Sequence, residues 1–246
     1  MLQALTFCAM VYSIASYDPT NLFTSFSSYL PSLSITPSVI YHSSESNIPF
    51  SEKSPSLEDS ENNLEQKVKQ YINSYPEQID ERGIQKKLVI HKQQHILDVY
   101  LNDKKIKTYQ SISLGDYIGN KEKEGDDKTP EGIFYIVQKK HTSKFYKALL
   151  LNYPLIDKAK DGLEKGIISP DEFTAIKYAQ DHCQPPPQTT KLGGYIEIHG
   201  DRDNRTEENW TWGCAALKNA EMDELFQFAE SGCVAGVGRT IVEIHP

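Results

Sequence analysis

Cysteine is scarce in this sequence. Its 246 residues include four cysteines, Cys8, Cys183, Cys214 and Cys233. They are too few and too irregularly spaced for a disulfide framework or a paired-cysteine zinc site, and the histidines show no metal-like spacing with carboxylates. We therefore expect no metal and no cofactor. A disulfide between Cys183 and Cys233 stays an open alternative, because the sequence cannot test the geometry that such a bond requires.

Basic residues are outnumbered by acidic ones. The chain has 26 Lys and Arg against 34 Asp and Glu, a formal net charge of -8 and a pI near 5.4. Proteins that bind nucleic acid gain affinity by placing Lys and Arg against the phosphate backbone. The charge therefore argues against a nucleic-acid partner.

The N-terminal segment lacks positive charge. The first basic residue is Lys53, so nothing before it supplies the positive start of an ordinary secretory signal. Residues 2–15 nevertheless form an uncharged, largely apolar run, and Ser13 and Ala15 are small residues at the positions that a signal peptidase reads. We interpret residues 1–16 as a signal segment; the alternative is a short apolar segment that packs on the domain. The run is shorter than the roughly 20 apolar residues that cross a bilayer, so no integral membrane span is expected.

The rest of the chain divides into three parts. Residues 17–63 are dense in Ser, Pro, Asn and Tyr without a helical or strand period, which is typical of a low-complexity linker. Residues 64–85 form a lead-in segment, where apolar residues at helical spacing predict a helix over 64–75 that Pro76 ends. One domain follows over residues 86–246.

Short alternating segments predict that this domain is mostly β. We expect strands at residues 87–91, 96–101, 105–114, 132–137, 195–198 and 240–244. Residues 141–190 read as a mixed insertion or lid with one helix over 170–179. A further helix should begin after Asn219 as its N-cap and end near Gly232.

Cys214 and His199 are the residues that suggest chemistry. Cys214 follows Gly213, which lets another backbone approach closely. His199 ends a predicted strand fifteen residues earlier. A thiol attacks a carbonyl as its thiolate, which a nearby histidine helps to form. Spacing alone, however, leaves an ordinary buried cysteine and a core histidine as the default.

The joint pattern of three motifs resembles the L,D-transpeptidase catalytic domain of the YkuD type. The motifs are residues 128–132 (KTPEG), similar to the TPxG turn of this family, residues 196–200 (IEIHG) and residues 211–217 (TWGCAAL). They occur in the order found in the family, and the resemblance covers about residues 86–246. It implies a β-rich α+β fold with a helical insertion and an irregular N-terminal extension. It also implies attack on the amide after the L-centre of a diamino acid in a peptidoglycan stem peptide.

The resemblance assigns roles to individual residues. Cys214 would be the nucleophile that forms a thioester, and His199 the general base. Gly200 would orient the imidazole through its carbonyl. The amides around Trp212, Gly213 and Cys214 are candidates for the oxyanion hole. An amine that releases the thioester would complete a transpeptidation.

A second set of residues is predicted to bind substrate. Its members are Tyr153, Trp210, Thr211, Trp212, Gly213 and Arg202. For Tyr153 and Trp210, a core or rim aromatic is an equally good interpretation.

Two positions depart from the family pattern. Many members carry a histidine two residues before the cysteine and an arginine two residues after it; here these positions are Trp212 and Ala216. His199 alone would then serve as the base, and another cation would have to anchor the substrate. The candidates for that cation are Arg202, Arg205 and Arg239.

The alternatives differ in how the thioester is resolved. The Gly-Cys-x-Ala-Leu form, with residues 151–154 (LNYP) upstream, looks more like a subgroup that includes an amidase separating lipoprotein from diaminopimelate. A hydrolase, either amidase or L,D-carboxypeptidase, is therefore the alternative, and a non-catalytic wall-binding domain is a third. The implied partners are peptidoglycan stem peptides and a wall-attached lipoprotein. Because this substrate lies outside the cytoplasm, the expected location is the cell envelope, periplasmic or secreted.

Overall fold

The computed structural model describes residues 63–78, 83–201, 203, 205, 209–232 and 239–246. The expected signal segment, and all of the expected linker except Asn63, lie outside these residues. Both therefore stay predictions.

Among the described residues, eight strands form one sheet in the order β3-β2-β1-β10-β5-β6-β7-β9. The strands are β1 Lys86–His91, β2 Ile96–Leu101, β3 Lys104–Tyr109, β5 Gly132–Ser143, β6 Tyr146–Leu151, β7 Glu197–His199, β9 Ala215–Ala216 and β10 Thr240–His245. The pairs β1–β10 and β7–β9 are parallel and the other neighbours are antiparallel. A separate parallel pair joins β4 Leu114–Gly115 to β8 Asn209–Thr211.

Strand β5 connects the two halves of the sheet. Its first residues pair with β10 and its later residues with β6. The register with β6 shifts between Ile136 and Gln138 and again between Lys140 and Ser143. Such bulges bend a strand and increase its twist. The two halves of the sheet therefore face each other across a common core.

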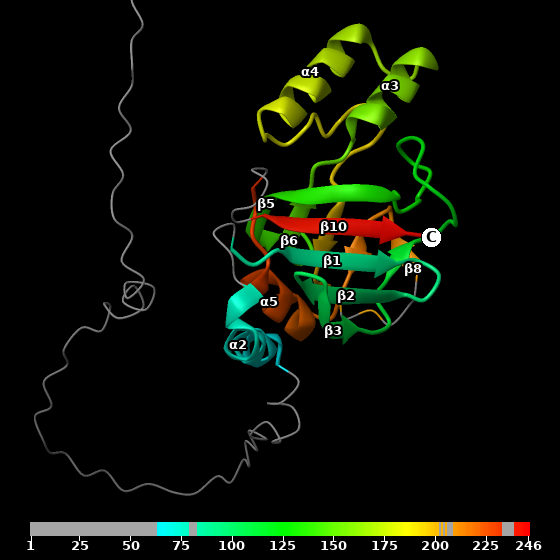
Figure 1. Ribbon diagram of the computed structural model, residues 1–246. Coiled ribbons are helices and arrows are strands. Elements are labelled where there is room, and N and C mark those ends of the chain that lie inside the picture. The colour runs from blue at the N-terminus through cyan, green and yellow to red at the C-terminus, as the bar shows by residue number, and fades with distance from the viewer. Residues whose placement is uncertain (1–62, 79–82, 202, 204, 206–208, 233–238) are drawn as a thin grey trace, which may run out of the picture. The chain divides into compact units, whose positions relative to one another are not determined.

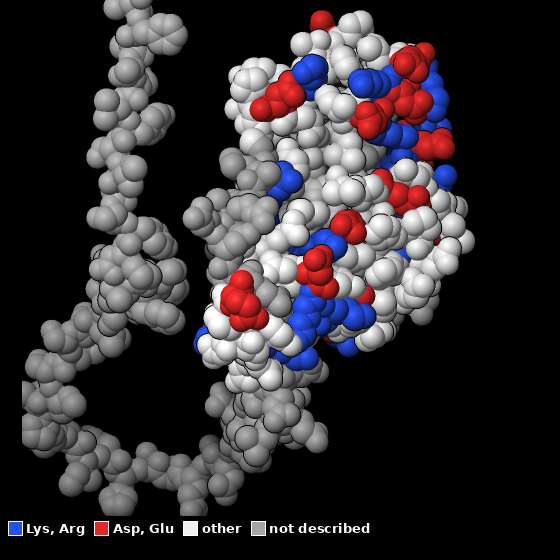
Figure 2. Space-filling view, in the orientation of Figure 1, with Lys and Arg blue, Asp and Glu red and all other residues white. Residues whose placement is uncertain are grey.

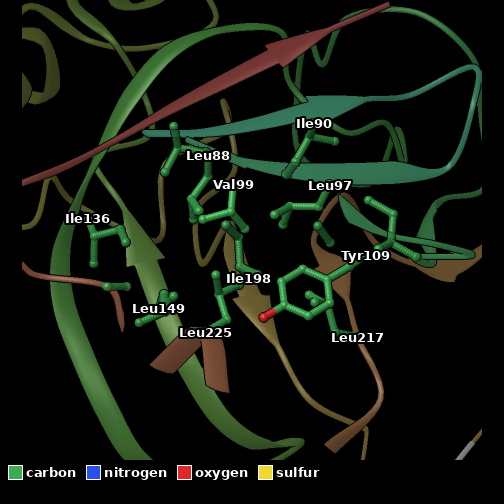
Figure 3. Packing of buried hydrophobic residues seen from close by; sticks show 14 of the residues in the cluster. Leu88, Ile90, Leu97, Val99, Tyr109, Ile136, Leu149, Ile198, Leu217 and Leu225 are labelled. Atoms are coloured by element: carbon green, nitrogen blue, oxygen red, sulfur yellow. The ribbon is translucent and has the colours of Figure 1, made fainter. Parts of the chain in front are cut away.

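The core fills the space between these halves. Figure 3 shows Leu88 of β1 and Val99 of β2 packed near Leu149 of β6, Ile198 of β7 and Leu225, and all five are fully buried. Burying a leucine or isoleucine side chain stabilises the fold by roughly 1.5–3 kcal/mol. This packing fixes β7, the strand that ends in His199.

Two helices lie on the side of the molecule near β3. Figure 1 shows α2 (Leu64–Ser74) beside α5 (Asn219–Phe228). Asn63 caps α2 by accepting a hydrogen bond from the Glu65 amide at 2.8 Å. The helix predicted over 64–75 is thus confirmed, and a 3-10 helix, η2 (Pro76–Gln78), begins at the predicted stop.

The helical insertion is a pair of helices with its own small core. In Figure 1, α3 (Ile156–Glu164) and α4 (Pro170–Asp181) lie together, above β5 in this view. The shared cluster contains Ala159, Ile168, Ile176 and Leu192. Figure 2 shows acidic and basic side chains interspersed over this region, where surface ion pairs such as Lys165–Asp161 occur. Within the described segments, no helix is both long and apolar enough to cross a membrane.

The predicted β-rich α+β class with a helical insertion is confirmed. Strand β6 and helix α3 were not predicted, and the strand expected over 105–114 is interrupted between β3 and β4. The expected N-cap of α5 is wrong, since Lys218 holds that position and the helix ends at Phe228 instead of near Gly232. The Asn219 side chain instead accepts a hydrogen bond from the Asp201 amide at 2.9 Å, which ties α5 to the segment after His199.

Candidate active site

The parallel pairing of β7 with β9 brings the two motif residues together. Ile198 pairs with Ala215, and His199 pairs with Ala216. Side chains alternate between the two faces of a strand. Cys214, one residue before Ala215, therefore falls on the face of the sheet that carries His199.

His199 is held by its own neighbour in sequence. The residue is 1% exposed, and its Nδ1 lies 2.6 Å from the Gly200 carbonyl oxygen. A carbonyl can only accept a hydrogen bond, so Nδ1 carries the proton and Nε2 keeps a lone pair. Burial lowers the pKa of His199, although the Gly200 carbonyl and the Glu197 carboxylate act in the opposite direction. The ring is therefore neutral at neutral pH and its Nε2 can accept a proton.

Gly200 itself is required by close packing. A Cβ at this position would lie 2.4 Å from Asn219 Oδ1 and 2.8 Å from the Tyr146 ring. Its amide donates to the Lys147 carbonyl at 3.1 Å. These contacts fix the carbonyl that orients His199.

Two aromatic side chains enclose the imidazole. The Phe145 ring stacks on His199 with centroids 4.6 Å apart and an interplanar angle of 18°. The Trp210 ring meets His199 edge-on at 5.7 Å and also contacts Phe145. Trp210 was a sequence candidate, but Phe145 was not, because it comes from the turn between β5 and β6.

The Cys214 thiol donates a hydrogen bond to the Tyr195 carbonyl oxygen at 3.2 Å. Burial raises the pKa of this thiol to about 12, and the negative charge of Glu197 adds to the effect. No hydrogen bond joins Cys214 and His199 in the described part of the chain. With its pKa raised so far above neutrality, the thiol is protonated at neutral pH.

Thr211 shapes the loop that carries the cysteine. Its hydroxyl oxygen accepts from the Gly213 amide at 3.2 Å, and the hydroxyl donates to the Cys214 carbonyl at 2.8 Å. The Gly213 amide is thus occupied in this state, which argues against its place in the predicted oxyanion hole. The Cys214 amide donates to no acceptor among the described residues.

Gly213 is a position where only glycine fits. Its φ is +119°, and a Cβ would lie 2.5 Å from the Lys128 carbonyl oxygen. Lys128 begins the TPxG-like turn, and the buried Thr129 hydroxyl oxygen of that turn accepts from the Gly115 amide at 3.0 Å. Lys92 donates to the Thr129 carbonyl at 2.9 Å. The cysteine loop therefore packs against the backbone of this turn.

Two ion pairs, one buried and one partly buried, act on the charge of the thiol. Lys140 Nζ and Glu197 Oε1 are 2.5 Å apart, and Lys121 Nζ and Asp126 Oδ1 are 2.7 Å apart. Burial alone would raise the pKa of Asp126, but hydrogen bonds from Lys121 and three backbone amides lower it to about 2. Glu197 raises the pKa of Cys214, whereas Lys121 and Lys140 lower it. These pairs set the electrostatic environment of the nucleophile.

The remaining candidates lie in different surroundings. Trp212 is 73% exposed beside the cysteine loop, whereas Tyr153 is buried and donates its hydroxyl to the Leu192 carbonyl at 2.8 Å. Tyr153 is therefore a core residue here, which is one of the two interpretations that the sequence allowed. Arg202 lies outside the described residues.

The other two arginines are already engaged. Arg205 lies over the Trp210 ring at 4.1 Å and pairs with Asp203 at 2.6 Å. Arg239 lies over the Tyr135 ring at 5.5 Å. Both arginine side chains thus already have partners, and neither is shown to bind substrate beside the thiol.

The described residues contain no group of three or more His, Cys, Asp or Glu side chains that could hold a metal ion. Of the cysteines in this part of the chain, Cys214 is a free thiol and Cys183 is disulfide-bonded. Cys233, which the sequence offers as a partner, lies outside the described residues. Cys214 is thus the thiol available for chemistry in this region.

A family model described as the L,D-transpeptidase catalytic domain (YkuD) matches residues 85–244. The putative L,D-transpeptidase YafK of Escherichia coli (strain K12) is 28% identical over 164 residues, which are 64% of this chain and 52% of that protein. This chain therefore spans about half the length of the curated relatives it matches.

Solved structures with a similar chain course include the helical cell shape determining protein Pgp2 from Campylobacter jejuni. It is 24% identical, with a TM-score of 0.44, and the match covers 66% of this chain and 48% of that one. Bd1075 from Bdellovibrio bacteriovorus is 19% identical with a TM-score of 0.42, covering 65% and 48%. Both candidate residues, His199 and Cys214, lie inside the range that the family model matches.

Proposed function

Because this chain belongs to the L,D-transpeptidase catalytic-domain family, we propose that it is a peptidoglycan-modifying cysteine L,D-transpeptidase. Cys214 forms a thioester with the donor stem peptide, and His199 serves as general base. The substrate places the protein in the cell envelope, periplasmic or secreted.

One observation carries this proposal. The Gly200 carbonyl holds the proton of His199 on Nδ1, at 2.6 Å, which leaves Nε2 as an acceptor on the face of the sheet that also carries Cys214. A neutral imidazole with a fixed tautomer on the same face as a free thiol is an arrangement from which general-base catalysis by a cysteine can start.

Acylation begins from the resting thiol. When a donor peptide binds, the thiol turns from the Tyr195 carbonyl towards His199. Nε2 takes the proton as Sγ bonds to the substrate carbonyl carbon, because a thiol with a pKa of about 12 is not ionised beforehand. The Cys214 amide donates to the oxyanion.

His199 also transfers the protons in the two steps that follow, the loss of the leaving amine and the attack of the acceptor on the thioester. The imidazolium gives its proton to the leaving amine as the C–N bond breaks, and the thioester remains. An acceptor amine then attacks the thioester and loses a proton to His199. Sγ leaves as the new amide forms and regains its proton from His199.

Hydrolysis is the second candidate, because water could replace the acceptor amine. The Gly-Cys-x-Ala-Leu sequence supports it through its similarity to an amidase subgroup. Position 216, where many members have arginine, is an alanine that is 3% exposed in β9. On this alternative the enzyme is an amidase or L,D-carboxypeptidase, and a wall-attached lipoprotein is a substrate.

Product analysis separates these activities. The purified full chain is incubated with crosslinked or lipoprotein-bearing peptidoglycan, and the fragments are identified by mass spectrometry. New crosslinks support transpeptidation, whereas only shortened or freed stems support hydrolysis. Cys214→Ala and His199→Ala should each abolish turnover, while His245→Ala, which changes an exposed histidine at the end of β10, should not. Turnover that survives either site substitution would overturn the assignment, and an inactive wild type that still binds the wall would favour a non-catalytic binding domain.

A further inference from the structure

The turn between β5 and β6 brings a lysine to the candidate active site. Lys144 and Phe145 are the two residues between the strands, and the flanking Ser143 and Tyr146 pair with each other. The Phe145 amide donates to the Ser143 hydroxyl at 3.1 Å, and its ring stacks on the His199 imidazole. The backbone of Lys144 is therefore fixed directly beside the candidate base.

The Lys144 side chain reaches from this turn to the cysteine loop. Its Nζ lies 5.4 Å from the ring centroid of Phe145 and 5.8 Å from that of Trp212. Trp212 is two residues before Cys214 and is largely exposed. Ring faces attract a cation. The two rings thus hold the ammonium group beside the loop that carries Cys214 without neutralising its charge.

Two neighbouring cations of the same hairpin are neutralised by carboxylates. Lys140 pairs with Glu197 at 2.5 Å, and Lys147 pairs with Asp223 at 2.7 Å. Lys144 is exposed and forms no ion pair with any residue that the structure describes. Its charge is therefore available to an anionic group of a bound molecule.

We propose that Lys144 binds a free carboxylate of the donor stem peptide, with Phe145 and Trp212 as the floor of this subsite. The inference rests on the proposed function and names the substrate contact that the cysteine loop does not supply. Ala216 replaces the arginine of many family members and is buried, so it cannot make this contact. A lysine ammonium is a compact charge with three donors and can bind either oxygen of a carboxylate.

A donor peptide offers two carboxylates near the bond that Cys214 attacks. One is the terminal carboxylate of the leaving amino acid, and the other is the carboxylate on the second centre of diaminopimelate. Both have the same chemistry, so peptides with one or the other amidated distinguish them.

The test uses the full chain and a synthetic stem tetrapeptide that ends in diaminopimelate and one D-amino acid. Lys144→Gln removes the charge, and Lys144→Arg keeps it. Lys104→Gln is the matched control, since Lys104 lies over the Tyr75 ring at 4.1 Å on β3, outside the candidate site. Peptide binding is measured by calorimetry on a Cys214→Ala background, and kcat and KM on the active protein.

We expect Lys144→Gln to weaken binding and raise KM by about 10- to 100-fold, the usual range for one charged hydrogen bond, with kcat changed less than about threefold. Lys144→Arg should restore most of the affinity, and Lys104→Gln should leave it unchanged. Amidation of the contacted carboxylate should weaken wild-type binding to the same extent, with no further loss in Lys144→Gln.

Three results overturn the subsite. The first is equal binding by the Cys214→Ala protein with and without Lys144→Gln, and the second is a loss on amidation that adds to the loss from Lys144→Gln for every peptide. The third is the absence of any peptide binding. Failure of the proposed function looks different, because the wild type would then bind the peptide with the Lys144 dependence intact but neither cleave nor exchange it.

Discussion

The resting state of Cys214 can be tested by its rate of alkylation. A thiol pKa of about 12 leaves roughly one thiolate in 10⁴ at pH 8, whereas an ordinary cysteine with a pKa near 8.5 is about one quarter ionised. A thiolate of higher pKa is intrinsically more nucleophilic, by roughly 30-fold over this interval. We therefore expect iodoacetamide to modify Cys214 roughly 10²-fold more slowly than a free thiol.

Glu197→Gln is the perturbation that tests the cause of this shift. Adjacent parallel strands lie about 4.8 Å apart, so the Glu197 carboxylate is on the order of 6 Å from Sγ. At an effective dielectric near 20, two charges at that separation interact by about 3 kcal/mol, and the partner Lys140 offsets part of it. Removing the carboxylate should lower the thiol pKa by about 1–2 units and speed alkylation roughly 3- to 10-fold after the loss in nucleophilicity.

The assay follows Cys214 by peptide mass mapping over pH 7 to 10. The logarithm of the wild-type rate should rise by about one per pH unit without a plateau. Glu230→Gln is the matched control, because Glu230 pairs with Lys86 at 2.5 Å in the same way but is not among the charges that shift the thiol. A wild-type plateau below pH 8, or a Glu197→Gln rate within twofold of wild type, would refute the reasoning.

Three further predictions concern the support of the site. Phe145→Leu should open the packing over His199 and raise the lowered pKa of His199 towards 6.5. The acid limb of the kcat/KM profile should then move to higher pH, and an unmoved limb would contradict the stacking role. Gly213→Ala should cost roughly 2–4 kcal/mol in urea unfolding and abolish activity, because its Cβ meets the Lys128 carbonyl; a wild-type midpoint would show that the loop can adjust. Asp126→Asn should cost about 2 kcal/mol above pH 4, since the pKa falls from 3.8 to about 2, and the difference from wild type should vanish as the pH falls through 2; a pH-independent difference would point to packing instead.

Runs of apolar residues predicted strands at the positions of β1, β2, β5 and β10 but missed β6. In β6, the four residues at positions 148–151 are all buried, so the alternation of buried and exposed residues that reveals a strand is absent. Helix α3 was missed because its residues are mostly polar and include Gly162. A Cβ there would lie 2.9 Å from the Leu192 side chain, so that glycine serves close packing within the helix.

The motifs identified Cys214 and His199, but not the residues that control them. Phe145 reaches the imidazole only through the register of the β5–β6 hairpin. Tyr195 presents its carbonyl to the thiol with a φ of +52°, a left-handed conformation that no local sequence rule assigns to tyrosine. Contacts of this kind depend on tertiary structure and on single backbone angles, which a sequence pattern does not encode.

The packing of Gly213 against Lys128 limits how the cysteine loop can be transplanted. The seven residues of the loop motif include no group that replaces the Lys128 carbonyl. The turn that contains Lys128 is itself held by the hydrogen bond from Lys92 to the Thr129 carbonyl. A graft of residues 211–217 onto another β-scaffold would therefore carry the thiol without the surface that shapes its backbone. The smallest portable unit extends from β1 to β9, so a designer would have to move most of the domain to move the nucleophile.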